Sequence, residues 1–61
     1  MKIKDVDNNI GVPIMITDYL GGTGSIITII SRKRSLVSFK YADSGLVGLI
    51  HRQHIVSFSR A

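Results

Sequence analysis

The chain has 61 residues, which is room for one small domain, and we expect residues 1–61 to fold as a single unit. Cysteine and glutamate are both absent, which excludes disulfides, thiolate zinc sites and cysteine nucleophiles. The net charge of +4 is unevenly spread. Residues 1–23 carry −1 (two lysines against three aspartates), whereas residues 24–61 carry +5 (six lysines and arginines against one aspartate). Such a basic half indicates a polyanionic partner.

The residue types favour strands over helices. Ten isoleucines, five valines and three threonines are β-branched and suit a pleated surface, while two alanines and one glutamine leave few strong helix formers. We find no glycine-free window with apolar residues at positions i, i+3, i+4 and i+7. The expected fold class is therefore all-β.

The first part of the chain predicts two strands and a loop. Residues 2–6 alternate polar and apolar types and are expected to form a strand that ends in a turn at residues 7–9. Residues 12–17 predict a second strand. Its Pro13 has no N–H to donate, which places the start of this strand at a sheet edge. Residues 18–24 are expected to form a glycine-rich loop.

The middle of the chain predicts a hairpin. Residues 25–31 form a continuous apolar run, as expected for a strand that is buried on both faces. Three cations at residues 32–34 are expected at the hairpin tip. Residues 36–41 alternate cleanly, so Val37 and Phe39 share one face with Tyr41.

The last part predicts a turn, a strand, a kink and a closing strand. These are expected at residues 42–45, 46–51, 52–53 and 55–59, respectively. Together the runs predict a small, five-stranded, SH3-like antiparallel barrel or meander. Whether residues 1–10 join the sheet stays open.

No group of residues in the sequence fits catalysis or a cofactor. The glycines at residues 21–24 lack the Lys-Ser/Thr pair and the following helix of a phosphate-binding loop. His51 and His54 supply two imidazoles, whereas a metal site needs three or four ligands. No serine lies in a nucleophile elbow. We therefore expect a non-enzymatic protein without a cofactor or a metal.

Cations at and near the expected hairpin tip are the main candidate site. Arg32, Lys33 and Arg34 are adjacent, and Lys40 and Arg52 extend the set. Such cations contact phosphate backbones without choosing a sequence, which favours a regulatory module that binds nucleic acid, RNA or DNA. The alternative is that these charges only keep a hairpin tip soluble.

The spacing of apolar residues and glycines resembles that of small SH3-like barrels, including KOW and Sm-like modules. In those folds a meander leads into a one-turn kink, here residues 51–54, and a closing strand, here residues 55–58. The residues that carry the resemblance span about two thirds of the chain; they are Gly24, residues 26–30, Val37, Phe39, Gly45, Ile50 and Ile55.

A second resemblance is to the carbon storage regulators, a family of intertwined β dimers that bind messenger RNA. Residues 11–18 read G-V-P-I-M-I-T-D and are similar to the family's G-E-T-L-M-I-G-D. Residues 50–55 read I-H-R-Q-H-I and are similar to V-H-R-E-E-I. The resemblance implies that Arg52 matches the family's main RNA-contacting arginine.

Self-association is expected because 44% of the residues are hydrophobic, more than a lone domain of this size hides easily. A protein-interaction module, such as an inhibitor or adaptor that binds through an exposed strand edge, is the alternative function, and a structural subunit of an assembly is a third. The sequence shows neither a secretory signal nor a membrane span. We expect a cytoplasmic protein.

Overall fold

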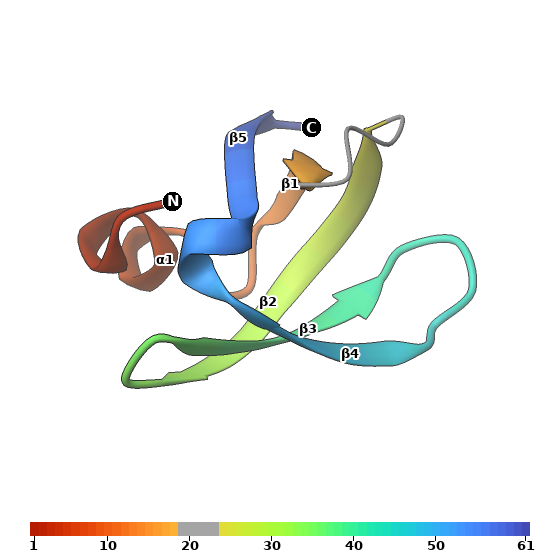
Figure 1. Ribbon diagram of the computed structural model, residues 1–61. Helices are drawn as coiled ribbons and strands as arrows, with labels where there is room; N and C mark the ends of the chain where they lie inside the picture. Colours follow the sequence, from red (N-terminus) through yellow and green to blue (C-terminus); the bar gives the residue numbers. More distant parts are fainter. Residues whose placement is uncertain (19–23) are drawn as a thin grey trace.

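The computed structural model describes residues 1–18 and 24–61, so most of the loop expected at residues 18–24 lies outside the described residues. The described residues form a small all-β domain with five strands, one short helix and one 3-10 turn (Figure 1), which confirms the expected fold class. In chain order the elements are α1 (Ile3–Asn8), β1 (Pro13–Asp18), β2 (Ser25–Lys33), β3 (Leu36–Tyr41), β4 (Val47–His51), η1 (Arg52–His54) and β5 (Ile55–Arg60).

The strands form one antiparallel sheet in the order β4-β3-β2-β1-β5. The nine-residue β2 joins the two halves of the sheet. Its residues 25–28 pair with β1, and its residues 27–29 and 31–33 pair with β3. The register of β2 against β3 shifts between Ile29 and Ser31, a β-bulge at Ile30. In the described residues β4 and β5 pair with one neighbour each and not with each other, so the sheet is open.

The expectation that Pro13 marks a sheet edge is wrong. β1 lies between β2 and β5, and Pro13 is opposite Thr28 of β2. Proline is tolerated there because it is the first residue of the strand. Its carbonyl oxygen still accepts a hydrogen bond from the Ala61 N–H (3.3 Å).

The strand expected at residues 2–6 is also wrong, because residues Ile3–Asn8 form α1. Six residues are too few for a stable isolated helix, so tertiary contacts hold it. The side chain of Val6 is fully buried in the core, and the Asn9 amide donates to the Asp5 carbonyl oxygen (2.7 Å) at the end of the helix. The burial of Val6 therefore stabilises a helix here, although the alternation of polar and apolar residues favours a strand.

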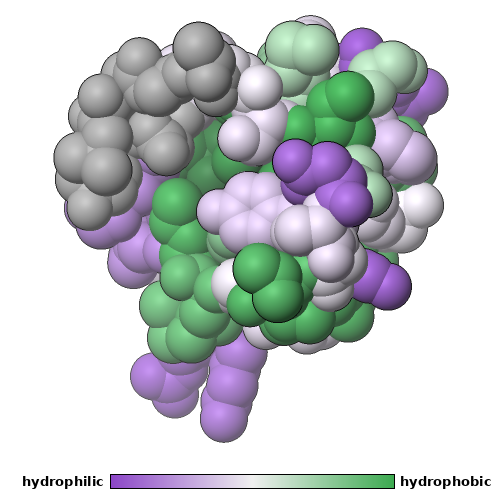
Figure 2. Space-filling view, turned by 90° about the vertical axis from the view of Figure 1, so that its right-hand side faces the viewer, coloured by the Kyte–Doolittle hydropathy of each residue, from purple (hydrophilic) through white to green (hydrophobic). Residues whose placement is uncertain are grey.

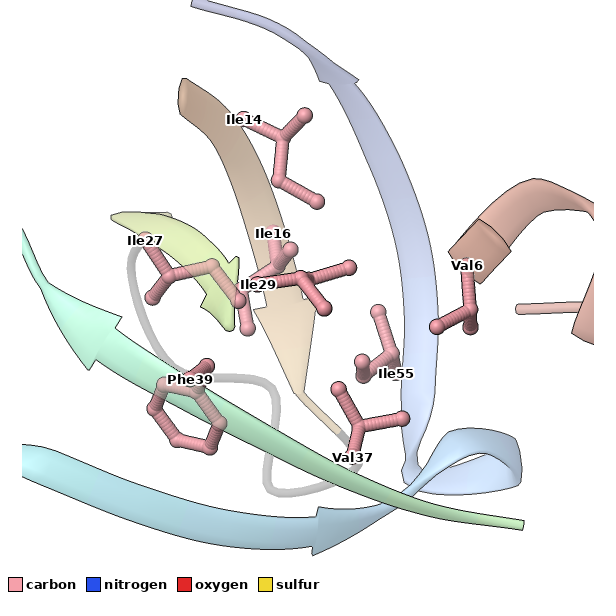
Figure 3. Close-up of a cluster of buried hydrophobic side chains, with 8 residues drawn as sticks. All are labelled: Val6, Ile14, Ile16, Ile27, Ile29, Val37, Phe39 and Ile55. Carbon is pink, nitrogen blue, oxygen red and sulfur yellow. The ribbon is translucent and has the colours of Figure 1, made fainter. Parts of the chain in front are cut away.

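The core lies on the inner face of the sheet, where side chains from α1 and four strands point toward one another (Figure 3). β2 is buried on this face alone: Ile26 and Ile30 are 40% and 49% exposed on the other. The expectation that this strand is buried on both faces is therefore wrong for a single chain. The buried residues are Val6, Ile14, Ile16, Ile27, Ile29, Val37, Phe39 and Ile55.

Gly48 lets β4 lie close against β3. It is opposite Phe39, and a Cβ atom at this position would approach the Phe39 ring to 2.6 Å. The ring also packs edge-on against Tyr41, with 5.1 Å between the ring centroids. A side chain at Gly48 would therefore displace the largest side chain of the core.

We predict that Ile29→Ala lowers the free energy of unfolding by about 2–5 kcal/mol, because a fully buried side chain leaves a cavity. The matched variant Ile30→Ala, one residue further along β2, should cost less than about 1 kcal/mol since this side chain is half exposed. Urea denaturation measures both. Equal losses would contradict the assignment of the two faces.

Candidate nucleic-acid interface

Two exposed cations lie at the end of the β2–β3 hairpin, Lys33 as the last residue of β2 and Arg34 in the turn. Lys33 pairs with Leu36, so the turn residues are Arg34 and Ser35. Of the tip expected at residues 32–34, only Arg34 lies in the turn, because Arg32 and Lys33 still belong to β2. Arg34 has a φ of 56°, in the left-handed region that non-glycine residues seldom adopt.

Arg32 lies in β2 and faces the inner side of the sheet. The bulge at Ile30 reverses the alternation, so Arg32 is opposite the buried Val37 and points toward α1. There its Nε and Nη2 donate to the two carboxylate oxygens of Asp7 (2.7 and 2.9 Å), and its Nη1 donates to the Arg34 carbonyl oxygen (2.6 Å). Arg32 therefore ties the hairpin to α1.

This ion pair shifts the pKa of both partners. The hydrogen bond from Arg32 lowers the pKa of the Asp7 carboxyl below its ordinary value of 3.8, and Asp7 raises the pKa of the Arg32 guanidinium in return. Both groups are charged at neutral pH. Because the Asp7 carboxylate compensates the charge of Arg32, Arg32 attracts an anionic ligand less strongly than Lys33 and Arg34 do.

Arg52 lies beside the β2–β3 turn, although it is far away in the sequence. Its backbone N–H donates to the Ser35 carbonyl oxygen (2.8 Å), which brings η1 against the turn. Its side chain extends toward the start of the chain, where Nη1 donates a hydrogen bond to the Met1 carbonyl oxygen (3.4 Å). Its Nε is buried and has no hydrogen-bond partner within the described residues. We call Lys33, Arg34 and Arg52 the basic tip.

The fold does not bring Lys40 to the basic tip. It lies near the other end of β3, exposed and opposite Thr28 and Val47. The five cations named from the sequence therefore divide into four groups. Lys33 and Arg34 are exposed at the end of the hairpin, Arg52 reaches the turn through its backbone, Arg32 is paired with α1, and Lys40 lies at the far end of the hairpin.

The kink at η1 brings the two histidines near each other, with 5.8 Å between the ring centroids. His51 Nδ1 accepts a hydrogen bond from the Gln53 N–H (3.2 Å), so this nitrogen caps the turn. In residues 1–18 and 24–61 no three His, Cys, Asp or Glu side chains gather as a metal ion would require.

Two depressions mark the surface, one at each end of the β2–β3 hairpin. The one at the turn has a volume of about 590 Å³ and is lined by Lys33, Arg34, Ser35 and Leu36. The other, of about 720 Å³, is larger but has no lysine or arginine in its lining, which is Gly24, Ser25, Ile26, Tyr41, Ala42, Asp43, Ser44 and Leu46. Charge therefore favours the smaller depression as a site for a polyanion.

Sequence reasoning found the cations but not the residues that organise them. Asp7 lies 25 positions from Arg32, and Ser35 lies 17 positions from Arg52. No local pattern signals contacts over such separations. Only the fold shows that Arg32 is engaged and that Arg52 joins the turn.

Comparisons of this chain with protein-family models, with curated proteins and with solved structures give no match. The two resemblances drawn from the sequence therefore stay predictions. In the part of the chain that the structure describes, no helix has the length and apolar character needed to cross a membrane.

We predict that Asp7→Asn lowers the melting temperature at pH 7 by a few degrees and weakens its dependence on acid pH. The folded-state pKa of Asp7 is lowered, so its stabilisation is present above the ordinary pKa of 3.8 and is lost as pH falls through the lower folded-state value. The melting temperatures of wild type and variant should therefore converge as the pH falls below 3.8 and through the lower folded-state pKa. Thermal unfolding followed by circular dichroism measures this.

Arg32→Gln provides the control for this ion pair. In that background Asp7→Asn should change neither the melting temperature nor its pH dependence, because the partner is already gone. Full additivity of the two substitutions would show that the carboxylate acts elsewhere.

Proposed function

We propose that this chain is a small, non-enzymatic regulatory module that binds the phosphate backbone of nucleic acid through the basic tip. The observation that carries the proposal is the convergence of Lys33, Arg34 and Arg52 on one end of the domain. Arg52 is held there by the hydrogen bond from its backbone N–H to the Ser35 carbonyl oxygen. Asp7, the acid that approaches this end, is already engaged by Arg32.

The exposed end of the hairpin suits contact with the phosphate backbone of a nucleic acid. Arg34 lies in the two-residue turn and Lys33 directly precedes it at the end of β2; both are exposed and line an open depression. Phosphate contacts of this kind position a protein on nucleic acid and release counterions, but they do not read the bases. Lys40 adds a more distant contact along β3.

In the described residues no phenylalanine or tyrosine offers a stacking surface at the basic tip. Phe39 is buried, and Tyr41 is 36% exposed but lies at the opposite end of β3, where its ring packs against Phe39. Phe58 is also 36% exposed, but it lies in β5 opposite Ile16 of β1. Stacking platforms provide much of the affinity of single-strand binders. We therefore propose electrostatic binding of RNA and DNA with little sequence preference.

We predict that affinity falls steeply with salt. Three phosphate contacts per copy give a slope of log affinity against log salt of about −2.1 to −2.7, so the affinity drops about 20- to 40-fold between 50 and 200 mM salt. Fluorescence anisotropy with labelled 20-nucleotide RNA and DNA measures this slope. Binding that ignores salt, or no binding to either probe, would overturn the proposal.

The variant Lys33→Ala/Arg34→Gly should lower the affinity at 50 mM salt at least tenfold and reduce the slope to about −1. Glycine is chosen at position 34 because it adopts the positive φ of this residue without strain. The matched control Lys2→Ala/Lys4→Ala removes the same charge from exposed positions at the start of the chain. It should change affinity less than about threefold, and an equal loss in both variants would show that only net charge matters.

A further inference from the structure

The outer face of the sheet formed by β2, β3 and β4 carries uncovered apolar side chains. Val37 and Phe39 of β3 point into the core (Figure 3), so the alternate residues of β3 and their partners on the neighbouring strands point outward. The solvated face of an antiparallel sheet is normally polar. Here four large aliphatic side chains are between 45% and 66% exposed; they are Ile30, Leu36, Val47 and Leu49. We call these four residues the outer patch.

The side chains of the outer patch lie together across three neighbouring strands. Leu49 of β4 is opposite Ser38 of β3. Ser38 is in turn opposite Ser31 of β2, which directly follows Ile30. Leu36 occupies the outward position before Ser38 on β3. Figure 2 views the molecule from the side of the β3–β4 connection, at one end of this face, and apolar surface (green) is prominent there. Contiguous apolar surface of this kind marks an interaction site.

The charged residues that the three strands carry on this face all have the same sign. Lys33 is opposite Leu36, and Lys40 is opposite Val47, so both lysines flank the outer patch. The three strands contain no aspartate, and the chain has no glutamate. A second copy packed face to face would therefore bring lysine toward lysine without a carboxylate to pair with it. An apolar surface flanked by carboxylates would instead pair with both lysines.

We propose that the outer patch binds an amphipathic helix of a partner protein whose apolar stripe is flanked by aspartate or glutamate. The width of the patch fits a helix, because β2 and β4 lie on either side of β3 and are about 10 Å apart, which is the diameter of an α-helix. Partner residues spaced at i, i+3, i+4 and i+7 contact the four aliphatic side chains, and acidic residues beside them pair with Lys33 and Lys40.

This helix-binding face is separate from the proposed binding of nucleic acid and does not rest on it. The two surfaces are adjacent, because Lys33 of the basic tip is opposite Leu36 of the outer patch. The chain's own helix, α1, packs on the core side through Val6 and leaves the outer face open. The chain then joins nucleic acid at the end of its hairpin to a partner protein on its outer face.

Three synthetic peptides test the proposal. The first is an 18-residue helical peptide with leucine at positions i, i+3, i+4 and i+7, flanked by glutamate. The second has serine in place of every leucine, and the third has lysine in place of every glutamate. Fluorescence anisotropy should show that the first peptide binds at least about tenfold more tightly than either of the others. Equal binding of the first and second peptides would overturn the proposal, because charge alone would then explain it, and so would equal binding of the first and third.

Leu49→Asp and Val56→Asp form a matched pair that locates the contact. The two side chains are 65% and 64% exposed, and both substitutions add one negative charge, but Val56 lies in β5 at the opposite edge of the sheet. Leu49→Asp should weaken binding of the first peptide at least about tenfold, and Val56→Asp should change it less than about threefold. Equal losses would show that the peptide responds to net charge and not to the outer patch. If circular dichroism shows that an aspartate variant is unfolded, Leu49→Ser and Val56→Ser provide the same comparison.

Two other occupants of the outer patch are outcomes of the same experiments. Sedimentation of wild type at 0.5 mM tests a second copy: a species larger than 6.7 kDa that Leu49→Asp abolishes and Val56→Asp retains would assign the patch to self-association. Vesicles of phosphatidylserine, compared with vesicles of phosphatidylcholine, test a membrane surface. Binding to the anionic vesicles that depends on Leu49, without binding of the first peptide, would assign the patch to lipid. Either result would overturn the proposal, as would a first peptide that does not bind at 1 mM.

Discussion

The rest of the structure depends on the packing and pairing of Ile29 in β2. Its side chain is fully buried, its backbone is opposite Phe39 of β3, and its carbonyl oxygen accepts a hydrogen bond from the Gly11 N–H (2.9 Å). It also forms an isolated bridge with Ile10. One residue thus joins the core, the hairpin and the segment that follows α1.

The candidate site follows from the same strand. Immediately after Ile29 the bulge reverses the alternation, which turns Arg32 inward to Asp7 and leaves Lys33 and Arg34 at the exposed end. A regular strand would have placed Arg32 on the outer face. The bulge therefore turns Arg32 toward α1, where it joins α1 to the hairpin, and leaves Lys33 and Arg34 exposed to solvent.

Much of the sheet could be predicted from the sequence, because alternation and turn residues are local signals. The bounds of β3 agree with the prediction, and the turn at residues 42–45 and the kink before β5 lie where expected. α1 could not be found in this way, because a six-residue helix depends on the burial of Val6 rather than on its own pattern. For the site, the residue types were identifiable but their partners were not, since these contacts join residues far apart in the chain.

The positive φ of Arg34 lowers the stability of the β2–β3 turn. Glycine at a φ of 56° is free of the roughly 1–2 kcal/mol that a Cβ atom costs there, so it would be the more stable choice. The chain has arginine instead and so trades stability for a positive charge at the most exposed end of the hairpin. Such a trade is typical of positions that are kept for what they contact rather than for how they fold. A screen for thermal stability alone would therefore be expected to replace this arginine with glycine.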